Sequence, residues 1–457
     1  MTSITTCNEI FLQTVRIAAG APGVIARSGA ILHLAMFEAV NSLSGTPYDS
    51  YLNALTCLPD PNARPELSAI YAAQRVLTQL AQDSHVVAAT RQTAVQQTVN
   101  LSFQTLFLGI QATAAEHAGS RTYGECLADA VLASRQADGY DQGGVSNGSI
   151  LPGYWRPTQP NTTGVTPHWG RVRPFSNWPS PHAFRPTLPG GYATMSDLLA
   201  SPEYAAQVEE VRLLGGANSA GRTDEQTQIA FFWANDLDGT SKPPGQLYSL
   251  TATIARQRNL SLVETARLFA LVGMAMADAA VVAWDAKYET PIDLWRPETA
   301  IHEANADGNV GTVHDPTWQP LSRTAPAQGM TSAPGQPMPA NVVTHFSPAF
   351  PAYVSGHATF GAAHAAAMRV ALGTDNITFI ATTEDPNATV RQRSFNSLTA
   401  AALENARSRV YLGVHFQWDG DNGFLSGTRV GELVATQLLK PRIPIPMAVP
   451  AGQPQTV

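Results

Sequence analysis

SLVETARLFALVGMAMADAAVVAWDAKYE, residues 261–289, is the stretch that decides the fold class. Apolar residues fill most of it and are interrupted by few charges, namely Glu264, Arg267 and Asp278 in its apolar part. Ser261, followed by Glu264 three residues later, forms a capping box, which marks the start of a helix. A stretch with this pattern is typical of a helix buried in a protein core and not of a membrane span.

Helical periodicity continues on both sides of this stretch. In residues 23–43 the apolar side chains fall on one stripe, as in an amphipathic helix. Alternating strand patterns are scarce, and further helices are predicted over residues 64–82, 86–137, 192–216, 222–257, 356–372, 394–412 and in a last helix ending near Leu439. The sequence therefore predicts an all-α protein built from packed helix bundles.

Composition sets broad limits on the class of protein. The chain has 457 residues, 44% of them hydrophobic, and a net charge of −7 with acidic and basic residues mixed, so no basic stripe indicates nucleic-acid binding. Cys7, Cys57 and Cys126 are far apart, and their odd number argues against a disulfide framework. The N-terminal residues lack the pattern of a secretory leader. We therefore expect a soluble protein, cytoplasmic by default.

Two Pro- and Gly-rich segments interrupt the helical pattern. Residues 139–191 contain Trp155, Trp169 and Trp178, so we expect this segment to lie packed across the helices. Residues 305–352 form a second irregular segment, which is either a lid or channel wall or a plain connector.

A charged cluster lies in SRVYLGVHFQWDGDNG, residues 408–423, where Arg409 precedes His415 by six residues and Asp419 follows it by four. One interpretation is a salt-bridged face at the start of a helix with a core histidine. In the other, Asp419 accepts the Nδ1 proton of His415 from one helical turn away. That contact would fix the tautomer and leave Nε2 free to attack or to ligate.

A second cluster, FPAYVSGHATFG, contains Ser355, Gly356 and His357 where a loop becomes a helix. Free backbone N–H groups and the positive end of the helix dipole make such a position suitable for an anion. Gly356 allows close approach of an oxyanion to the backbone. His357 would then act as an acid or base beside the bound anion.

The remaining cluster, WDAKYETPIDLWRPETAI, places Lys287 and Arg296 on either side of an irregular turn. Pro297 pushes Arg296 toward an extended backbone. Together the three clusters supply three cationic side chains, a hydroxyl, helix N-terminal amides and two histidines. This set fits a tetrahedral oxyanion such as phosphate or vanadate.

In this order the motifs resemble the signature of the vanadium-dependent haloperoxidases and the related type 2 phosphatidic acid phosphatase superfamily. That signature is Lys…Arg-Pro, then Pro-Ser-Gly-His, then Ser-Arg…Gly-x-His…Asp, and it runs here from Lys287 to Asp419. Eight residues separate Lys287 from Arg296, where the family usually has six and sometimes seven, and Val354 replaces the proline of the second motif. The resemblance implies two four-helix-bundle-like halves with long connecting loops.

The resemblance also implies an activity and a set of site residues. His415 would bind vanadium axially, and His357 would manage protons, with Lys287 also in the catalytic set. The equatorial oxygens would be held by Lys287, Arg296, Arg409, Ser355 and the amide of Gly356. The implied reaction is the vanadate-dependent oxidation of halide by hydrogen peroxide to hypohalous acid or halogenated organic products, and phosphate can occupy the same cradle.

Two alternatives use the same residues. In the phosphatase branch His415 would form a phospho-histidine while His357 protonates the leaving group. The second alternative is a non-enzymatic helical scaffold in which these residues bind phosphate structurally. Trp284 and Phe350 resemble the aromatic pair near the halide site of the family's chloroperoxidases, which favours halide, although both could be ordinary core residues. His345, five residues before Phe350, does not occupy the position of the additional histidine of bromoperoxidases.

For the whole chain we expect a single large helical domain over residues 1–457, with scaffold helices in 1–190 and active-site helices in 191–440. The expected partners are hydrogen peroxide, halide and a small organic acceptor, without nucleic acid or membrane. The resemblance leaves open a homodimer that pairs through helices.

Overall fold

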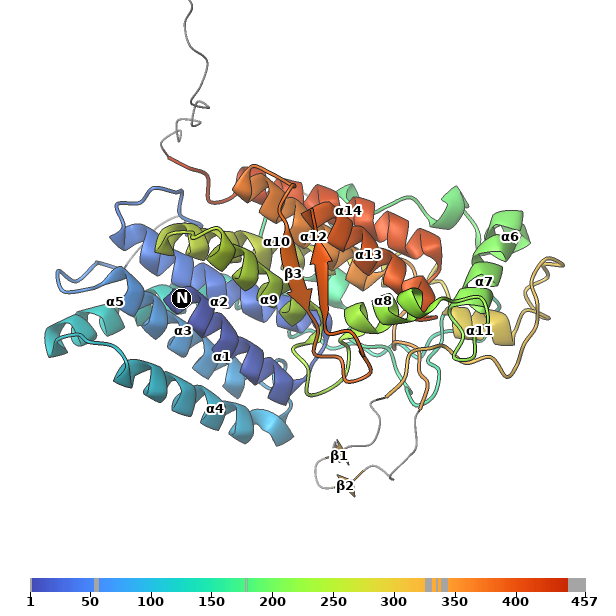
Figure 1. Cartoon of the computed structure of the whole chain (residues 1–457), viewed down its shortest axis with the longest axis horizontal. Helices are drawn as coiled ribbons and strands as arrows, with labels where there is room; N and C mark the ends of the chain where they lie inside the picture. Colours follow the sequence, from blue (N-terminus) through green and yellow to red (C-terminus); the bar gives the residue numbers. More distant parts are fainter. Residues whose placement is uncertain are drawn as a thin grey trace, which may run out of the picture.

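The apolar stretch at 261–289 forms α10 (Leu262–Tyr288), a long helix in the interior of the molecule (Figure 1). The Ser261 side chain accepts a hydrogen bond from the Glu264 amide, and the Glu264 carboxylate accepts one from the Ser261 amide at 2.9 Å, so the predicted capping box is confirmed. Helices α10 and α2 (Pro22–Leu43) are long and apolar enough to cross a membrane. However, the most apolar part of α10 is 94% buried inside the protein, and that of α2 is 100% buried. Both are therefore core helices.

The predicted all-α class is confirmed in this computed structural model, which describes residues 2–52, 57–176, 178, 180–324, 331–333, 336–337 and 344–442. The other α-helices are α1 (Ser3–Ala18), α3 (Pro65–Gln82), α4 (Ala89–Leu108), α5 (Ala114–Ser134), α6 (Met195–Ala200), α7 (Pro202–Leu214), α8 (Asp224–Ala234), α9 (Lys242–Gln257), α11 (Pro297–His302), α12 (Gly356–Leu372), α13 (Leu398–Tyr411) and α14 (Gln417–Gln437). Two short antiparallel pairs join β1 (Thr331–Ala333) to β2 (Gln336–Pro337) and β3 (Phe379–Thr382) to β4 (Gln392–Phe395).

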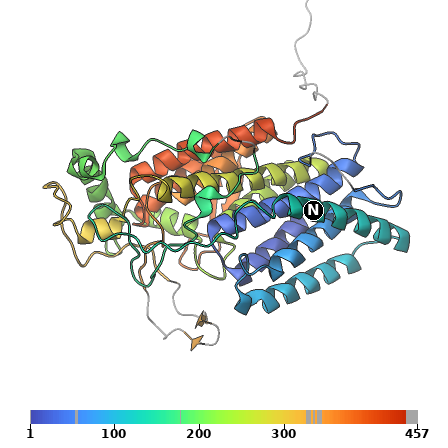
Figure 2. The same ribbon diagram turned by 180° about the vertical axis from the view of Figure 1, so that it is seen from behind.

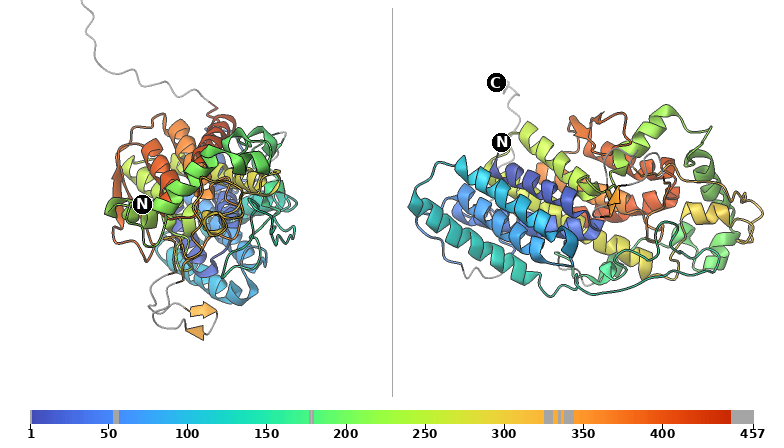
Figure 3. Two further views of the ribbon diagram at one scale, coloured as in Figure 1. Left: turned by 90° about the vertical axis from the view of Figure 1, so that its right-hand side faces the viewer. Right: turned by 90° about the horizontal axis from the view of Figure 1, so that it is seen from below.

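The helices form an elongated molecule. Helices α1 to α5 gather at one end, and α6, α7 and α11 lie at the other (Figures 1 and 2). Helix α10 packs against α2, α12 and α14. The view from below shows the N-terminal helices side by side and the C-terminal helices beyond them (Figure 3). A division into halves at residue 190 stays a prediction.

Several predicted helices have different limits in the structure. The stretch predicted at 222–257 breaks at Asn235, whose left-handed backbone (φ 41°) ends α8. The helix predicted at 394–412 begins at Leu398, because Ser397 caps it, and residues 392–395 pair with β3 instead. The predictions at 86–137 and 192–216 each contain two helices, namely α4 with α5 and α6 with α7.

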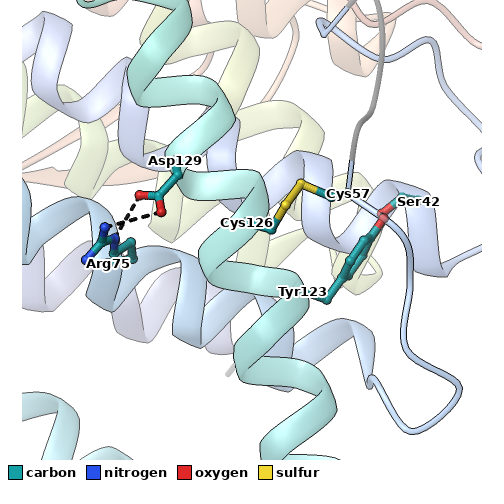
Figure 4. Close-up of a disulfide and its surroundings, with 6 residues drawn as sticks. All are labelled: Ser42, Cys57, Arg75, Tyr123, Cys126 and Asp129. Atoms are coloured by element: carbon teal, nitrogen blue, oxygen red, sulfur yellow. Dashed lines mark hydrogen bonds and ion pairs between the residues drawn. A yellow bond between two sulfur atoms is a disulfide. The ribbon is translucent and has the colours of Figure 1, made fainter.

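The cysteines contradict one expectation from the sequence. Cys57 and Cys126, 69 positions apart, form a disulfide with a Cα–Cα distance of 5.9 Å, which ties the segment before α3 to α5 (Figure 4). The argument from the sequence against a disulfide framework therefore missed this one bridge. The odd cysteine, Cys7, is buried in α1, so the odd count did not exclude a bridge.

The Trp-rich segment at 139–191 lies against the helices, as predicted. Trp155 and Trp169 are each 1% exposed. The carboxylate of Asp278 on α10 accepts hydrogen bonds from the amides of Phe175 at 2.6 Å and Ser176 at 2.9 Å. These bonds fasten the segment to the central helix.

Helices α12 and α14 approach each other closely through glycines on α14. A Cβ atom at Gly423 would lie 2.9 Å from the carbonyl oxygen of Ser355, and one at Gly431 would lie 2.9 Å from the Cβ of Ala366. A side chain has no room at these positions, so the glycines set the spacing of the two helices. This spacing places the start of α12 beside the start of α14.

Candidate oxyanion site

The sequence Ser355-Gly356-His357 lies at the start of α12, where the sequence predicted a loop-to-helix junction. Ser355 caps the helix, since its hydroxyl accepts a hydrogen bond from the Ala358 amide. The Ser355 amide donates to the Asp419 carbonyl at 2.9 Å. This bond links the N-terminus of α12 directly to the first turn of α14.

The residues Arg409, His415 and Asp419 do not share one helix, which corrects the interpretation of this stretch as a single helix start. Arg409 is in the last turn of α13, His415 is in the connection, and Asp419 is in the first turn of α14. The break follows from Gly413, whose φ of +81° requires a glycine, after which Phe416 caps the next helix. The turn directs all three side chains into the interior, where each is at most 1% exposed.

His415 is held by Asp419. Nδ1 of His415 lies 2.9 Å from Oδ2 of Asp419, which also accepts the Phe416 amide at 3.0 Å. Burial and the positive charges of Arg296 and Lys287 lower the pKa of His415 well below its ordinary value. The imidazole is therefore neutral, with its proton on Nδ1 and its lone pair on Nε2. Burial raises the pKa of Asp419 to about 7.

Arg296 lies just before α11 and contacts His415 at Nε2, the ring nitrogen opposite the one that Asp419 contacts. Its Nη1 donates to the carbonyl oxygen of Val414 at 2.7 Å and lies 3.0 Å from Nε2 of His415, and its Nε donates to the carbonyl oxygen of Phe350 at 2.7 Å. Burial lowers the pKa of Arg296 to about 9, so the guanidinium stays charged at neutral pH. Its buried Nη2 has no hydrogen-bond partner among the described residues.

Arg409 leaves more donors free. Its Nη2 donates to Oδ2 of Asp236 at 3.1 Å, but its buried Nε and Nη1 have no partner in the part of the chain that the structure describes. Unpaired buried donors on a charged group are costly, and an anion would satisfy them. Among the described residues, Arg296 and Arg409 therefore present three unpaired nitrogen atoms within the site.

His357 and Asp236 lie beside Arg409. Nε2 of His357 lies 3.0 Å from the carbonyl oxygen of Ala234 and 3.7 Å from Oδ2 of Asp236. Burial and the charge of Arg409 lower the pKa of His357 to about 4. Asp236 is not among the residues selected from the sequence, because it follows α8 in a stretch without a recognisable motif. Only the fold brings it to Arg409.

Lys287 is fully buried in the last turn of α10. Its Nζ donates to the carbonyl oxygens of Pro351 at 2.7 Å, Ala352 at 3.2 Å and Val354 at 2.5 Å. Burial and the neighbouring charge of Arg296 lower the pKa of Lys287 well below its ordinary value.

The two predicted halide-pocket aromatics lie together next to Lys287. The ring centroids of Trp284 and Phe350 are 5.1 Å apart, and Nζ of Lys287 is 4.9 Å from the Phe350 centroid. His345, by contrast, places Nδ1 2.6 Å from the carbonyl oxygen of Pro320. Part of the irregular segment at 305–352 lies outside the described residues, so its interpretation as a lid or a connector stays open.

The chemistry of this site suits an oxyanion better than a bare metal ion. Among the described residues no group of three or more His, Cys, Asp and Glu could hold a metal. One neutral histidine whose Nε2 lone pair faces Arg296, two arginines with N–H groups unpaired among the described residues and a helix N-terminus fit a tetrahedral anion such as vanadate or phosphate. The fold and the donors of this site are those expected of an oxyanion-binding protein built from helical bundles.

Comparisons with known proteins agree with this class. Residues 267–442 match the family described as VCPO second helical-bundle domain. The vanadium chloroperoxidase of Curvularia inaequalis is 30% identical over 322 residues, with coverage of 58% of this chain and 49% of the relative. The chain thus spans about half the length of that curated relative.

Solved structures extend the likeness to nearly the whole chain. The first bacterial vanadium-dependent iodoperoxidase matches with a TM-score of 0.76 and 25% identity, covering 96% of this chain and 98% of that one. A holo-type bacterial vanadium-dependent chloroperoxidase shares the fold, with a TM-score of 0.64 and 17% identity over 92% of this chain and 93% of that one. The chain is therefore similar to vanadium-dependent haloperoxidases, in sequence over its second half and in fold over nearly its whole length.

Proposed function

We propose that this protein is a vanadate-dependent haloperoxidase, which oxidises halide with hydrogen peroxide to hypohalous acid or halogenated organic products. The observation that carries the proposal is the set of buried N–H groups of Arg296 and Arg409 that are unpaired among the described residues, beside Nε2 of His415, whose lone pair faces Nη1 of Arg296. The likeness to vanadium chloroperoxidase supports the choice of vanadate as the anion.

In this proposal His415 would hold vanadium through Nε2, while Asp419 keeps the proton on Nδ1. The oxygens of the anion are held by Arg296, Arg409, Ser355 and the amide of Gly356. Bound vanadate supplies a Lewis acid that activates peroxide. His357, neutral because of its lowered pKa, accepts a proton from incoming peroxide. Lys287 adds its positive charge to the site.

The halide would lie near Trp284 and Phe350. A dry aromatic wall beside the cations of Lys287 and Arg296 suits a weakly hydrated anion, and both cations lie within 5 Å of the Phe350 ring centroid, at 4.9 and 4.8 Å. The relatives named above are haloperoxidases, which supports this branch over the phosphatase branch. Phosphate would be a competitor for the same cradle.

The cellular context is also a proposal. The Cys57–Cys126 disulfide favours folding in an oxidising compartment, in contrast to the cytoplasm expected by default from the sequence. Hydrogen peroxide, halide and a small organic acceptor remain the proposed partners. Pairing of two copies through helices would be tested by the mass of the protein in solution.

The experiment that tests the function is halide oxidation by purified anion-free protein with hydrogen peroxide, before and after addition of orthovanadate. Chloride, bromide and iodide are assayed separately, with a phosphate ester alongside. We expect vanadate-dependent oxidation that phosphate inhibits competitively and that His415→Ala abolishes. Hydrolysis of the ester, inhibited by vanadate and without halide oxidation, would move the protein to the phosphatase branch.

A further inference from the structure

Lys287 differs from the two arginines of the site in how its donors are used. An ammonium group has three N–H donors, and all three of Lys287 are engaged by the carbonyl oxygens of Pro351, Ala352 and Val354. Arg296 and Arg409, by contrast, keep nitrogen atoms that have no partner in the described part of the chain and that an anion can use. The capacity to bind a new anion therefore lies with the arginines.

The three carbonyl groups belong to the irregular segment that leads directly into Ser355 and Gly356 at the start of α12. Val354 directly precedes Ser355, the cap of α12, and Ala352 is fixed further by its amide, which donates to the Leu294 carbonyl at 2.7 Å. Phe350, one residue before this stretch, accepts the Nε proton of Arg296. The carbonyl groups of 351, 352 and 354 thus point to the Lys287 ammonium, and the carbonyl of Phe350 points to Arg296.

A shift of Lys287 Nζ toward an anion would break at least one of these bonds. The abandoned carbonyl would be left inside the protein without its donor, which is an unfavourable state for a buried acceptor. Because Lys287 is fully buried, a solvent water does not replace its N–H group as the donor to the abandoned carbonyl. The unpaired arginine donors face no such cost.

Resting on the function proposed above, we infer that Lys287 is a positioning residue in this protein and not a direct ligand of the oxyanion. It holds the backbone of 351–354 so that the Ser355 hydroxyl and the Gly356 amide stand ready for the anion. Arg296, Arg409, Ser355, Gly356 and His415 then form the direct binding set. The longer spacing between Lys287 and Arg296 accompanies this changed role.

The decisive measurement is a crystal structure of the wild-type protein loaded with orthovanadate, after calorimetry has shown that it binds. We expect Nζ of Lys287 to keep its three carbonyl partners, with no vanadate oxygen within hydrogen-bond distance. A bond from Nζ to a vanadate oxygen would overturn the inference. Failure of the wild type to bind vanadate at all would instead overturn the proposed function.

Two matched variants separate positioning from direct binding. Lys287→Met should lower the melting temperature of the anion-free protein and weaken orthovanadate binding by about tenfold, through the disturbed cradle. Arg409→Met should weaken binding by about 100-fold or more and lower the melting temperature of the anion-free protein less than Lys287→Met does. It removes two nitrogen atoms unpaired among the described residues and one ion pair, which is to the partly exposed Asp236. A Lys287→Met variant that loses as much affinity as Arg409→Met, with an unchanged melting temperature, would contradict the inference. Unchanged affinity in Lys287→Met would also contradict it, because Lys287 would then have only a structural role. If Lys287→Met does not fold, the vanadate-loaded wild-type crystal structure decides alone.

Discussion

Asp419 contacts His415 from the first turn of the following helix, with 2.9 Å between Oδ2 and Nδ1. The same oxygen accepts the amide of Phe416, which begins α14, so one carboxylate caps the helix and sets the imidazole tautomer. The orientation of the proposed vanadium ligand is therefore tied to the start of a helix. A substitution of Asp419 should therefore change the orientation and the protonation of Nε2 of His415, on the opposite side of the ring.

Asp419→Asn should weaken the binding of orthovanadate by about 10- to 100-fold, because an uncharged amide no longer fixes the Nδ1 proton as strongly. Calorimetric titration of the anion-free protein measures the effect. Asp421→Asn is the matched control, since Asp421 is an exposed residue of the same helix turn. Equal affinities for the two variants would remove Asp419 from the orientation of His415.

The charge of Arg409 should control the protonation of His357. Burial and Arg409 lower the pKa of His357 to about 4, because a nearby cation disfavours the imidazolium form. Arg409→Met removes that cation, so the pKa of His357 should rise, and the ring should take up its proton at a higher pH than in the wild type. Imidazole ¹⁵N NMR during a pH titration of the anion-free protein measures this shift.

His364 serves as the internal control for that titration. Burial lowers its pKa to about 4 as well, but Arg409 is not among the causes, since its neighbours are Thr251 and the Leu247 backbone. The pKa of His364 should stay constant between wild type and variant. If both histidines shift together, the change is a general loosening of the fold and not the loss of one charge.

The disulfide should stabilise the N-terminal helices. Cys57→Ser should lower the free energy of unfolding by about 2–5 kcal/mol, because the bridge closes a long loop in the unfolded chain. Urea unfolding with and without a reductant measures the loss. The reductant should destabilise the wild type to a similar degree and leave Cys57→Ser unchanged; a wild type indifferent to the reductant would argue that the bridge is absent in solution.

The helical class and the capping box of α10 could be predicted from the sequence because they depend on local periodicity and on residues three positions apart. The break at Asn235 could not, since it depends on a left-handed residue whose type gives only a weak signal. The disulfide was missed for a related reason. Two cysteines 69 positions apart meet only after α5 has packed beside the preceding helices.

The candidate site shows the same division between local and long-range information. Ser355, Gly356 and His357 were placed at a helix start because glycine and a capping serine mark such a junction. Asp236 was not selected, because its contact with Arg409 joins residues 173 positions apart. The hydrogen bonds from Lys287 to three carbonyl groups could not be predicted either. Every residue has a backbone carbonyl, so the residue types do not indicate which ones accept a hydrogen bond.

The close crossing of α12 and α14 should matter for the site as well as for stability. Gly423→Ala would place a methyl group 2.9 Å from the Ser355 carbonyl oxygen, so the helices must separate, at a cost of about 1–3 kcal/mol in unfolding free energy. The shift would also move Ser355, and orthovanadate affinity should fall with it. Gly420→Ala is a milder comparison, because its methyl group would lie 3.2 Å from the Ala406 carbonyl oxygen on α13, and the gain in helix propensity partly offsets the strain. Urea unfolding and calorimetry on both variants measure the two effects. If Gly423→Ala loses stability but binds orthovanadate like the wild type, the helix spacing supports the fold without setting the geometry of the cradle.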